Sequence, residues 1–98
     1  MIAVTARFQA KRGKEAELEA LLRSFVPRTS EEPEVLAYAL HTVSGQPRTF
    51  FFYERHASQQ SFEAHLARPY LQEALARFPE LLDAPAVLEI MEILDEKD

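Results

Sequence analysis

The sequence has no cysteine and only two glycines among its 98 residues. Without cysteine it can form neither a disulfide bond nor a thiolate metal site. With two glycines it lacks the glycine-rich loops that bind dinucleotides or nucleoside triphosphates, so we expect no NAD, flavin or ATP by those routes. The three histidines, His41, His56 and His65, lack the i, i+4 spacing of a helical metal pair. We therefore expect neither a metal nor a cofactor.

Basic residues and long apolar runs are also scarce. Lys and Arg number 11 against 16 Asp and Glu, which gives a formal net charge of -5. Such a surface does not attract a phosphate backbone or an anionic membrane. No apolar run approaches the length of a membrane-spanning helix, and the first residues lack the basic and apolar regions of a signal peptide. We expect a soluble, cytoplasmic protein with no nucleic-acid or membrane partner.

The first half of the chain predicts two strands separated by a helix. Apolar residues alternate along residues 2–8, which is typical of a strand. Acidic residues at Glu15 and Glu17 then suit the positive end of a helix. Pro27 disfavours helical geometry at Val26 and should end or kink that helix there. The apolar stripe of the expected helix consists of Leu18, Leu21, Leu22 and Phe25. A second strand follows at residues 35–43.

The second half predicts a hairpin, two short helices and a last strand. A turn at Ser44-Gly45-Gln46-Pro47 should make the Phe-rich strand that follows an antiparallel neighbour of the preceding one. Ser58 is a good N-cap for a helix to Leu66, and Pro69 suits the first position of another helix. Pro79 and Pro85 mark its exit, and a last strand covers residues 87–94. The order β-α-β-β-α-β predicts one domain, residues 1–98, with a ferredoxin-like α+β sandwich fold.

Both faces of the predicted sheet are apolar. In the Phe-rich strand Phe50 and Phe52 lie on one side, and Phe51 and Tyr53 lie on the other. Helices can cover only one face of a four-stranded sheet, so the second face needs another cover, most simply a second copy of the chain. We expect a homodimer.

Three segments resemble a known family. They are Glu32-Pro33-Glu34-Val35-Leu36-Ala37-Tyr38, Phe52-Tyr53-Glu54-Arg55 and Ala64-His65-Leu66-Ala67-Arg68-Pro69-Tyr70. Their order and spacing are similar to those of the antibiotic-biosynthesis monooxygenase family, small dimeric α+β barrels that include cofactor-independent quinol monooxygenases. The chain departs from the family at Glu34, where glycine is usual, and at His56, where an aromatic residue is common.

The resemblance implies a cofactor-independent monooxygenase that oxidises a small hydroquinone or polyphenol-like aromatic substrate with O2. Such an enzyme needs a base, a dry pocket and a hydrogen-bond donor for an oxyanion. We expect His65 to be the base, and Glu54 to orient the ring of His65 or to take the proton itself. Only these two residues coincide with recurring positions of the family. From residue chemistry, Tyr38 and Tyr70 would position substrate oxygens. The expected pocket wall consists of Phe52, Phe62 and Leu75.

Other interpretations stay open. His65 could be a structural histidine that packs beside Phe62, Glu54 could form an ion pair between subunits, and Tyr70 could be a half-buried helix residue. The fold also serves dimeric barrels that are isomerase-like or only bind small ligands. Haem-degrading relatives place a ligating histidine where we align Leu75, which cannot bind iron. An RNA-recognition module shares the element order, but this chain lacks the glycines of its motif and is acidic.

The acidic balance makes one prediction directly. The protein should retain no single-stranded RNA or DNA in a filter or mobility assay at physiological salt, because its acidic residues outnumber the basic residues that would bind phosphates and release their counterions. Tight, salt-sensitive binding would favour the recognition module over the enzyme.

Overall fold

The computed structural model describes residues 1–97. Four strands and three helices follow one another along the chain. Their bounds are β1 (Ile2–Gln9), α1 (Glu15–Thr29), β2 (Val35–Val43), β3 (Gln46–His56), α2 (Gln59–Leu66), α3 (Pro69–Leu81) and β4 (Val87–Glu92). Among the described residues no helix is both long and apolar enough to cross a membrane.

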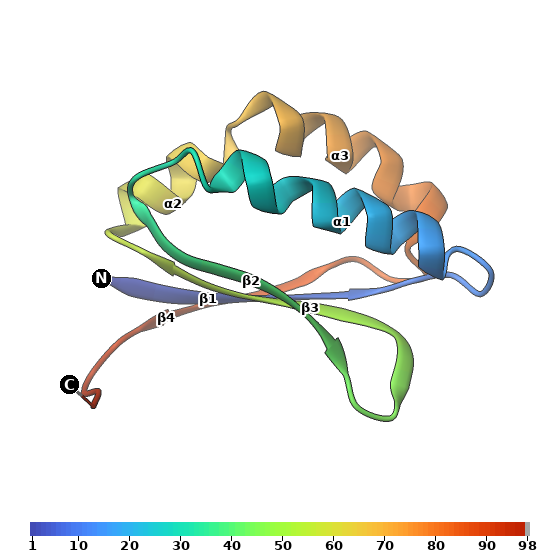
Figure 1. Cartoon of the computed structure of the whole chain (residues 1–98), viewed down its shortest axis with the longest axis horizontal. Coiled ribbons are helices and arrows are strands. Elements are labelled where there is room, and N and C mark those ends of the chain that lie inside the picture. Colours follow the sequence, from blue (N-terminus) through green and yellow to red (C-terminus); the bar gives the residue numbers. More distant parts are fainter. Residues whose placement is uncertain (98) are drawn as a thin grey trace.

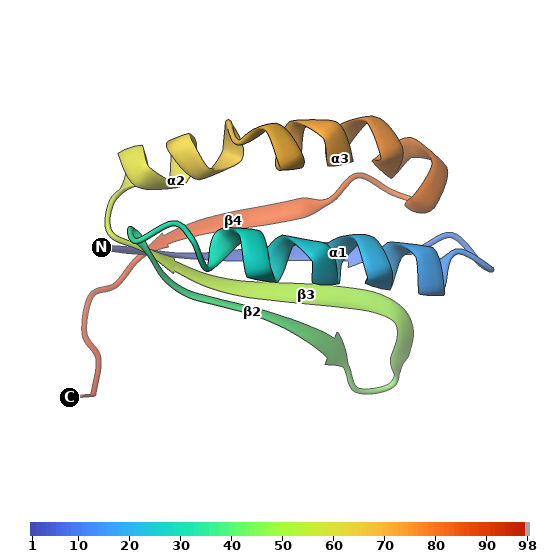
Figure 2. The same cartoon turned by 45° about the horizontal axis from the view of Figure 1, so that its top comes forward.

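The strands form one antiparallel sheet in the order β2-β3-β1-β4. All three helices lie on the same face of this sheet (Figure 1). In the turned view, α2 and α3 run along the β4 side, whereas α1 lies toward β3 and β2 (Figure 2). The predicted ferredoxin-like α+β fold, with its second helical region split in two, is therefore confirmed.

The register of β1 and β3 decides which side chains meet the helices. Ala6 pairs with Phe52 and Val4 pairs with Glu54, so the even-numbered residues of both strands share the helix-facing side. Phe52 is the centre of the core, with ring centroids 6.2 Å from Phe8 and 6.2 Å from Phe25. The predicted alternation of these strands is confirmed.

Helix α1 does not end where the sequence predicts. The expected end at Val26 is wrong, because α1 continues through Pro27 to Thr29. The Ser30 backbone N–H and hydroxyl group both donate to the carbonyl oxygen of Val26, which completes the last turn. Thr29 is buried, so tertiary packing holds a turn that the local preference of proline disfavours. In the same way α3 includes Pro79 and ends at Leu81.

The hairpin and the last strand are shorter than expected. The turn consists only of Ser44 and Gly45, whose φ of 76° is accessible to glycine at little cost. Pro47 belongs to β3 and lies where the register with β2 shifts between Thr42 and Val43, a position that tolerates a missing N–H. Strand β4 ends at Glu92, which pairs with the first strand residue of β1, instead of continuing to Leu94.

The sheet face opposite the helices is uncovered in a single chain. Tyr53 is 37% exposed, Met91 is 38% exposed and Val87 is 53% exposed, and all three point away from the helices by strand parity. Phe51 lies among them and is half-buried. An apolar face of this kind on a small protein marks a protein–protein contact.

We expect a second copy of the chain to cover this face. Met91→Glu or Phe51→Glu should convert a dimer into monomers or aggregate, because each places a charge in the contact. Sedimentation at micromolar concentration measures the change, with Ala20→Glu on the exposed side of α1 as the control. A wild-type protein that sediments as a stable monomer would contradict the expectation.

Candidate functional site

Two hollows lie between the helices and the sheet. The larger has a volume of about 810 Å³ and lies among α2, α3, the β3–β1 centre of the sheet and the segment that leads into β4. The smaller has a volume of about 460 Å³ and lies between α1 and the edge strand β2. Tyr38 borders both of them.

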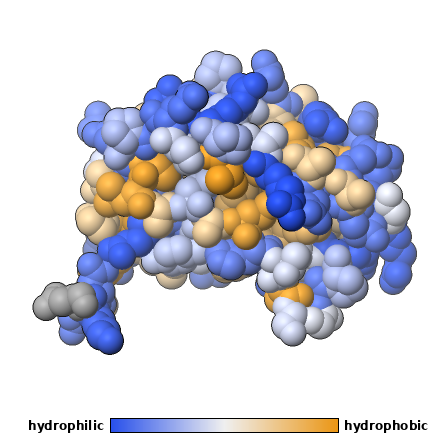
Figure 3. Space-filling model, in the orientation of Figure 1, coloured by the Kyte–Doolittle hydropathy of each residue, from blue (hydrophilic) through white to orange (hydrophobic). Residues whose placement is uncertain are grey.

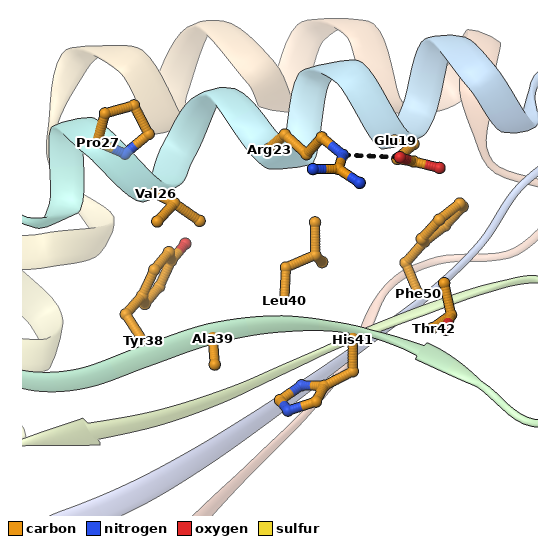
Figure 4. Close-up of a pocket in the computed structure, with 10 residues that line it drawn as sticks. All are labelled: Glu19, Arg23, Val26, Pro27, Tyr38, Ala39, Leu40, His41, Thr42 and Phe50. Atoms are coloured by element: carbon orange, nitrogen blue, oxygen red, sulfur yellow. Dashed lines mark hydrogen bonds and ion pairs between the residues drawn. The ribbon is translucent and has the colours of Figure 1, made fainter.

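The smaller hollow is a surface groove. Tyr38, Leu40 and Phe50 point from the strands toward α1, whereas His41 points away to the other face of the sheet (Figure 4). Apolar surface is visible along the band between α1 and β2 (Figure 3). Its one ion pair among the lining residues joins Arg23 to Glu19 at 2.7 Å, and both side chains are exposed to solvent. The groove therefore holds no buried acid or base except the shared Tyr38.

The larger cavity is bordered by titratable side chains. Glu54 from β3, His65 from α2 and Tyr38 from β2 all border it, although they come from three different elements. Its size lies within the roughly 300–1,000 Å³ of sites for drug-sized ligands. The remaining wall is mainly apolar and includes Phe8, Phe25, Phe52, Phe62, Leu66, Leu71, Leu75, Phe78, Leu82 and Leu88.

Local sequence features place Glu54 and His65 on this cavity. Glu54 has the strand parity of Phe52, and so it faces the helices. Ser58 starts α2 with a reciprocal capping box to Ser61, so the first turn of the helix is fixed. Phe62 and His65 are three residues apart on this helix, which puts both on its buried face.

His65 is held by a carboxylate from the loop before β2. Its Nδ1 lies 3.1 Å from Oε1 of Glu32, and both residues are buried. An ionised carboxylate only accepts, so the Nδ1–H of His65 donates to Glu32 and the lone pair resides on Nε2. Arg68 lies 3.5 Å from the same carboxylate oxygen. Among the described residues no hydrogen-bond partner occupies Nε2.

Glu54 is paired with a second histidine. Nε2–H of His56 donates to Oε1 of Glu54 at 2.8 Å. His56 is 0% exposed, and within residues 1–97 its Nδ1 has no partner. A buried N–H without an acceptor costs about 1–3 kcal/mol, so the tautomer that fits these contacts carries a proton on Nε2 and none on Nδ1.

These contacts correct one expectation. Glu54 does not orient the ring of His65, because its hydrogen bond goes to His56 and the ring of His65 is held by Glu32. The two imidazole rings are nevertheless neighbours, with centroids 5.3 Å apart. Glu54 is buried on the helix side of the sheet, and an ion pair between subunits stays an alternative prediction for it.

Tyr70 belongs to the support of Glu32. Its hydroxyl group donates to Oε2 of Glu32 at 2.7 Å and lies 2.7 Å from the hydroxyl group of Thr29, which therefore donates to it. Tyr70 does not border the cavity. Its expected role of positioning substrate oxygens is not supported by this placement.

Both tyrosines are kept protonated by their surroundings. Burial, together with the negative charge of Glu54, raises the pKa of Tyr38 far above its usual value of 10.0. Burial is also the main cause that raises the pKa of Tyr70 to about 12, and the hydrogen bond and negative charge of Glu32 add to it. At neutral pH the Tyr38 hydroxyl group is a hydrogen-bond donor beside the cavity.

The structure thus brings most of the predicted site residues together. Tyr38, Phe52, Glu54, Phe62, His65 and Leu75 all border the larger cavity, and Tyr70 stands behind it. Whether any of them takes part in chemistry stays a prediction. In the described part of the chain, no group of three or more His, Cys, Asp or Glu side chains is arranged to hold a metal ion.

Sequence reasoning missed Glu32 and His56 as members of the site. His56 could have been found, because residues two apart on a strand share a face and Glu54 was already placed. Glu32 does not share a strand or a helix with any predicted site residue, so periodicity could not place it at the site. It lies in a loop, 33 residues before His65, and only the packing of that loop beneath α2 and α3 brings the two together.

Known proteins share both the sequence pattern and the fold. The profile of the family described as antibiotic biosynthesis monooxygenase matches residues 1–77. An uncharacterized protein of Synechocystis, sll1783, is 27% identical over 94 residues, which is 96% of this chain. The chain spans 64% of the length of that curated relative.

Solved structures resemble the whole chain. Rv0793 from Mycobacterium tuberculosis superposes with a TM-score of 0.92 at 27% identity, over 99% of this chain and 98% of that one. A crystal structure of an antibiotic biosynthesis monooxygenase gives a TM-score of 0.89 at 22% identity, over 97% of this chain and 100% of that one, which shows a shared fold. Since the family profile covers more than three quarters of its residues and the folds agree, the chain belongs to the antibiotic biosynthesis monooxygenase family.

Proposed function

We propose that this protein is a cofactor-independent monooxygenase that oxidises a hydroquinone or polyphenol-like aromatic substrate with O2. One observation carries the proposal, beside membership of the family. An imidazole ring with a carboxylate behind it, His65 with Glu32, borders a mainly apolar cavity. A base in such a setting can remove a proton from a bound phenol while water is largely excluded.

The cavity suits an aromatic molecule. Phe52 and Phe62 supply ring faces, and Leu75 supplies an aliphatic wall at the exposed rim, where it is 54% accessible to solvent. Polar groups are few, so the ring of the substrate would be held by its apolar surface and oriented by its oxygen atoms. Glu54, His65 and Tyr38 are the polar groups that such oxygens would meet on the sheet side.

The first chemical step is loss of a proton from a substrate hydroxyl group to Nε2 of His65. The phenolate that forms is electron-rich and can reduce O2, so the substrate itself supplies the electrons. The neutral Tyr38 hydroxyl group, kept protonated by burial, can donate a hydrogen bond to the phenolate oxygen.

The remaining steps use three proton movements. O2 forms a bond to the ring carbon beside the phenolate oxygen, and the imidazolium of His65 returns its proton to the new peroxide. The carboxylate of Glu54 then removes the hydrogen on that carbon while the O–O bond breaks. A carbonyl group remains, and the departing hydroxide takes the proton that Glu54 has just accepted and leaves as water, which returns Glu54 to its carboxylate form. A hydroquinone and O2 thus give a hydroxyquinone and water, with every atom and electron accounted for.

One observation also favours a second candidate function. Two carboxylate–imidazole pairs lie at the cavity, and groups of this kind can transfer protons without O2. An isomerase-like protein that shifts a proton between two atoms of a bound ketone or enol would use the same cavity. Consumption of O2 separates the two functions, since only the monooxygenase takes it up.

The role of His65 is testable by substitution. His65→Ala should lower oxygen uptake with a responsive hydroquinone by about 10²-fold or more, the usual contribution of a general base. An oxygen electrode and a panel of one-ring, two-ring and three-ring hydroquinones provide the measurement. His41→Ala, which removes an exposed histidine outside the larger cavity, is the matched control. Undiminished uptake in His65→Ala would remove His65 from the mechanism.

The tyrosines predict a loss of stability at high pH. Tyr70 keeps its proton in the folded state up to a pKa of about 12, whereas an unfolded tyrosine releases it at about 10. Between these values the unfolded state binds fewer protons, so the free energy of unfolding should fall as pH rises, and the stabilisation is complete below pH 10. Denaturant unfolding from pH 8 to 11.5 should show this fall in the wild type and a smaller one in Tyr70→Phe. Parallel curves for the two proteins would count against the shift.

A further inference from the structure

The two carboxylate–imidazole pairs are oriented in opposite ways around the cavity. In the first pair the imidazole of His65 borders the cavity, and the carboxylate of Glu32 lies behind it. In the second pair the carboxylate of Glu54 borders the cavity, and the imidazole of His56 lies behind it. From these two pairs a ligand would therefore meet the imidazole of His65 and the carboxylate of Glu54, each with a partner on its far side.

We propose that Glu32 is a positioning residue that fixes the proton of His65 on Nδ1 and so keeps Nε2 available as the base. The proposal rests on the function proposed above and adds to it a residue that does not border the cavity. With the proton on Nε2 instead, the ring nitrogen without a protein partner would be a donor and could not accept a proton from substrate.

The surroundings of Glu32 hold its carboxylate in place. Tyr70 donates to one carboxylate oxygen, and His65 donates to the other. The Glu32 backbone N–H donates to the carbonyl oxygen of Thr29 at 2.9 Å, and its own carbonyl oxygen accepts from Val35 at 3.1 Å. Side chain and backbone of Glu32 are thus anchored to the end of α1, the start of β2 and both later helices.

A purely structural role of Glu32 predicts an effect on stability and none on the tautomer of His65. If Glu32 only tied its loop to α2 and α3, its replacement would lower stability without selecting a tautomer of His65. In serine proteases the carboxylate behind the catalytic histidine selects the tautomer, and its change to an amide lowers kcat by about 10⁴-fold. The tautomer of His65 is therefore the measurement that separates positioning from support.

The experiment is a long-range ¹H–¹⁵N spectrum of the full chain labelled at histidine, recorded at about pH 8.5, where an imidazole is ordinarily neutral. Signals that disappear in His65→Ala identify that ring. In the wild type, His65 should carry its proton on Nδ1, and His56, which donates from Nε2 to Glu54, should show the opposite tautomer in the same spectrum. A wild-type His65 protonated on Nε2 would overturn the proposal.

Glu32→Gln tests the cause. Its amide can either accept from Nδ1 or donate to it, so His65 should become a mixture of tautomers, while His56 stays unchanged and oxygen uptake falls at least about 10-fold. Glu31→Gln, the same substitution at the exposed neighbouring residue, should leave the tautomer and the uptake as in the wild type. If Glu32→Gln behaves like this control, Glu32 is no positioning residue. If Glu32→Gln does not fold, the wild-type spectrum decides.

The proposed function can fail independently. Absence of oxygen uptake with every hydroquinone, together with a wild-type His65 protonated on Nδ1 and a tautomer mixture in Glu32→Gln, would support the positioning by Glu32 and reject the monooxygenase. Oxygen uptake that is normal in Glu32→Gln would keep the monooxygenase and reject the positioning.

Discussion

The register between β1 and β3 is the constraint on which the rest of the structure depends. It puts Phe50, Phe52, Glu54 and His56 on the side of the helices in one row. A slip of one residue would bring Phe51, Tyr53 and Arg55 to that side and expose the core. The same register that buries Phe52 thus also buries a carboxylate and an imidazole, so the stability of the core and the presence of polar groups at the cavity come from one pairing.

Two buried carboxylates in a domain this small need hydrogen-bond partners that offset the cost of removing them from water. Glu54 is 5% exposed and Glu32 is 7% exposed, and an ionised group with so little water must be paired or hydrogen-bonded. Each has a histidine as its partner, and Glu32 has Tyr70 in addition. Removal of the donor leaves a buried carboxylate oxygen without its hydrogen bond, which costs at least about 1–3 kcal/mol. Polar groups of this kind weaken a fold unless they are satisfied, so their concentration at one cavity is an argument for a function there.

Sequence reasoning could predict those parts of the site that follow from local periodicity. Strand alternation placed Glu54 beside Phe52, and helical spacing placed His65 beside Phe62. It could not predict what the loop between α1 and β2 does. Local preference ends α1 before Pro27, yet the buried contact of Thr29 with Tyr70 extends the helix to Thr29 and sets the loop so that Glu32 reaches His65. The direction of the Tyr70 hydroxyl group has the same origin, since a half-buried helix residue can turn either way.

The cavity exists because the helices leave part of the sheet uncovered. Leu88 of β4 faces the helices and is still 43% exposed, and the neighbouring helix-facing residue Ile90 is 49% exposed. The segment after α3 is held to the end of β1 by Arg48. Its guanidinium group donates to Asp83 and to the carbonyl oxygen of Ala10, each at 2.8 Å. Closer packing of α3 on β4 would bury more apolar area and fill the space beside Glu54 and His65. The gap leaves apolar area exposed that closer packing would bury, and its position beside two carboxylate–imidazole pairs supports the proposal of a binding site there.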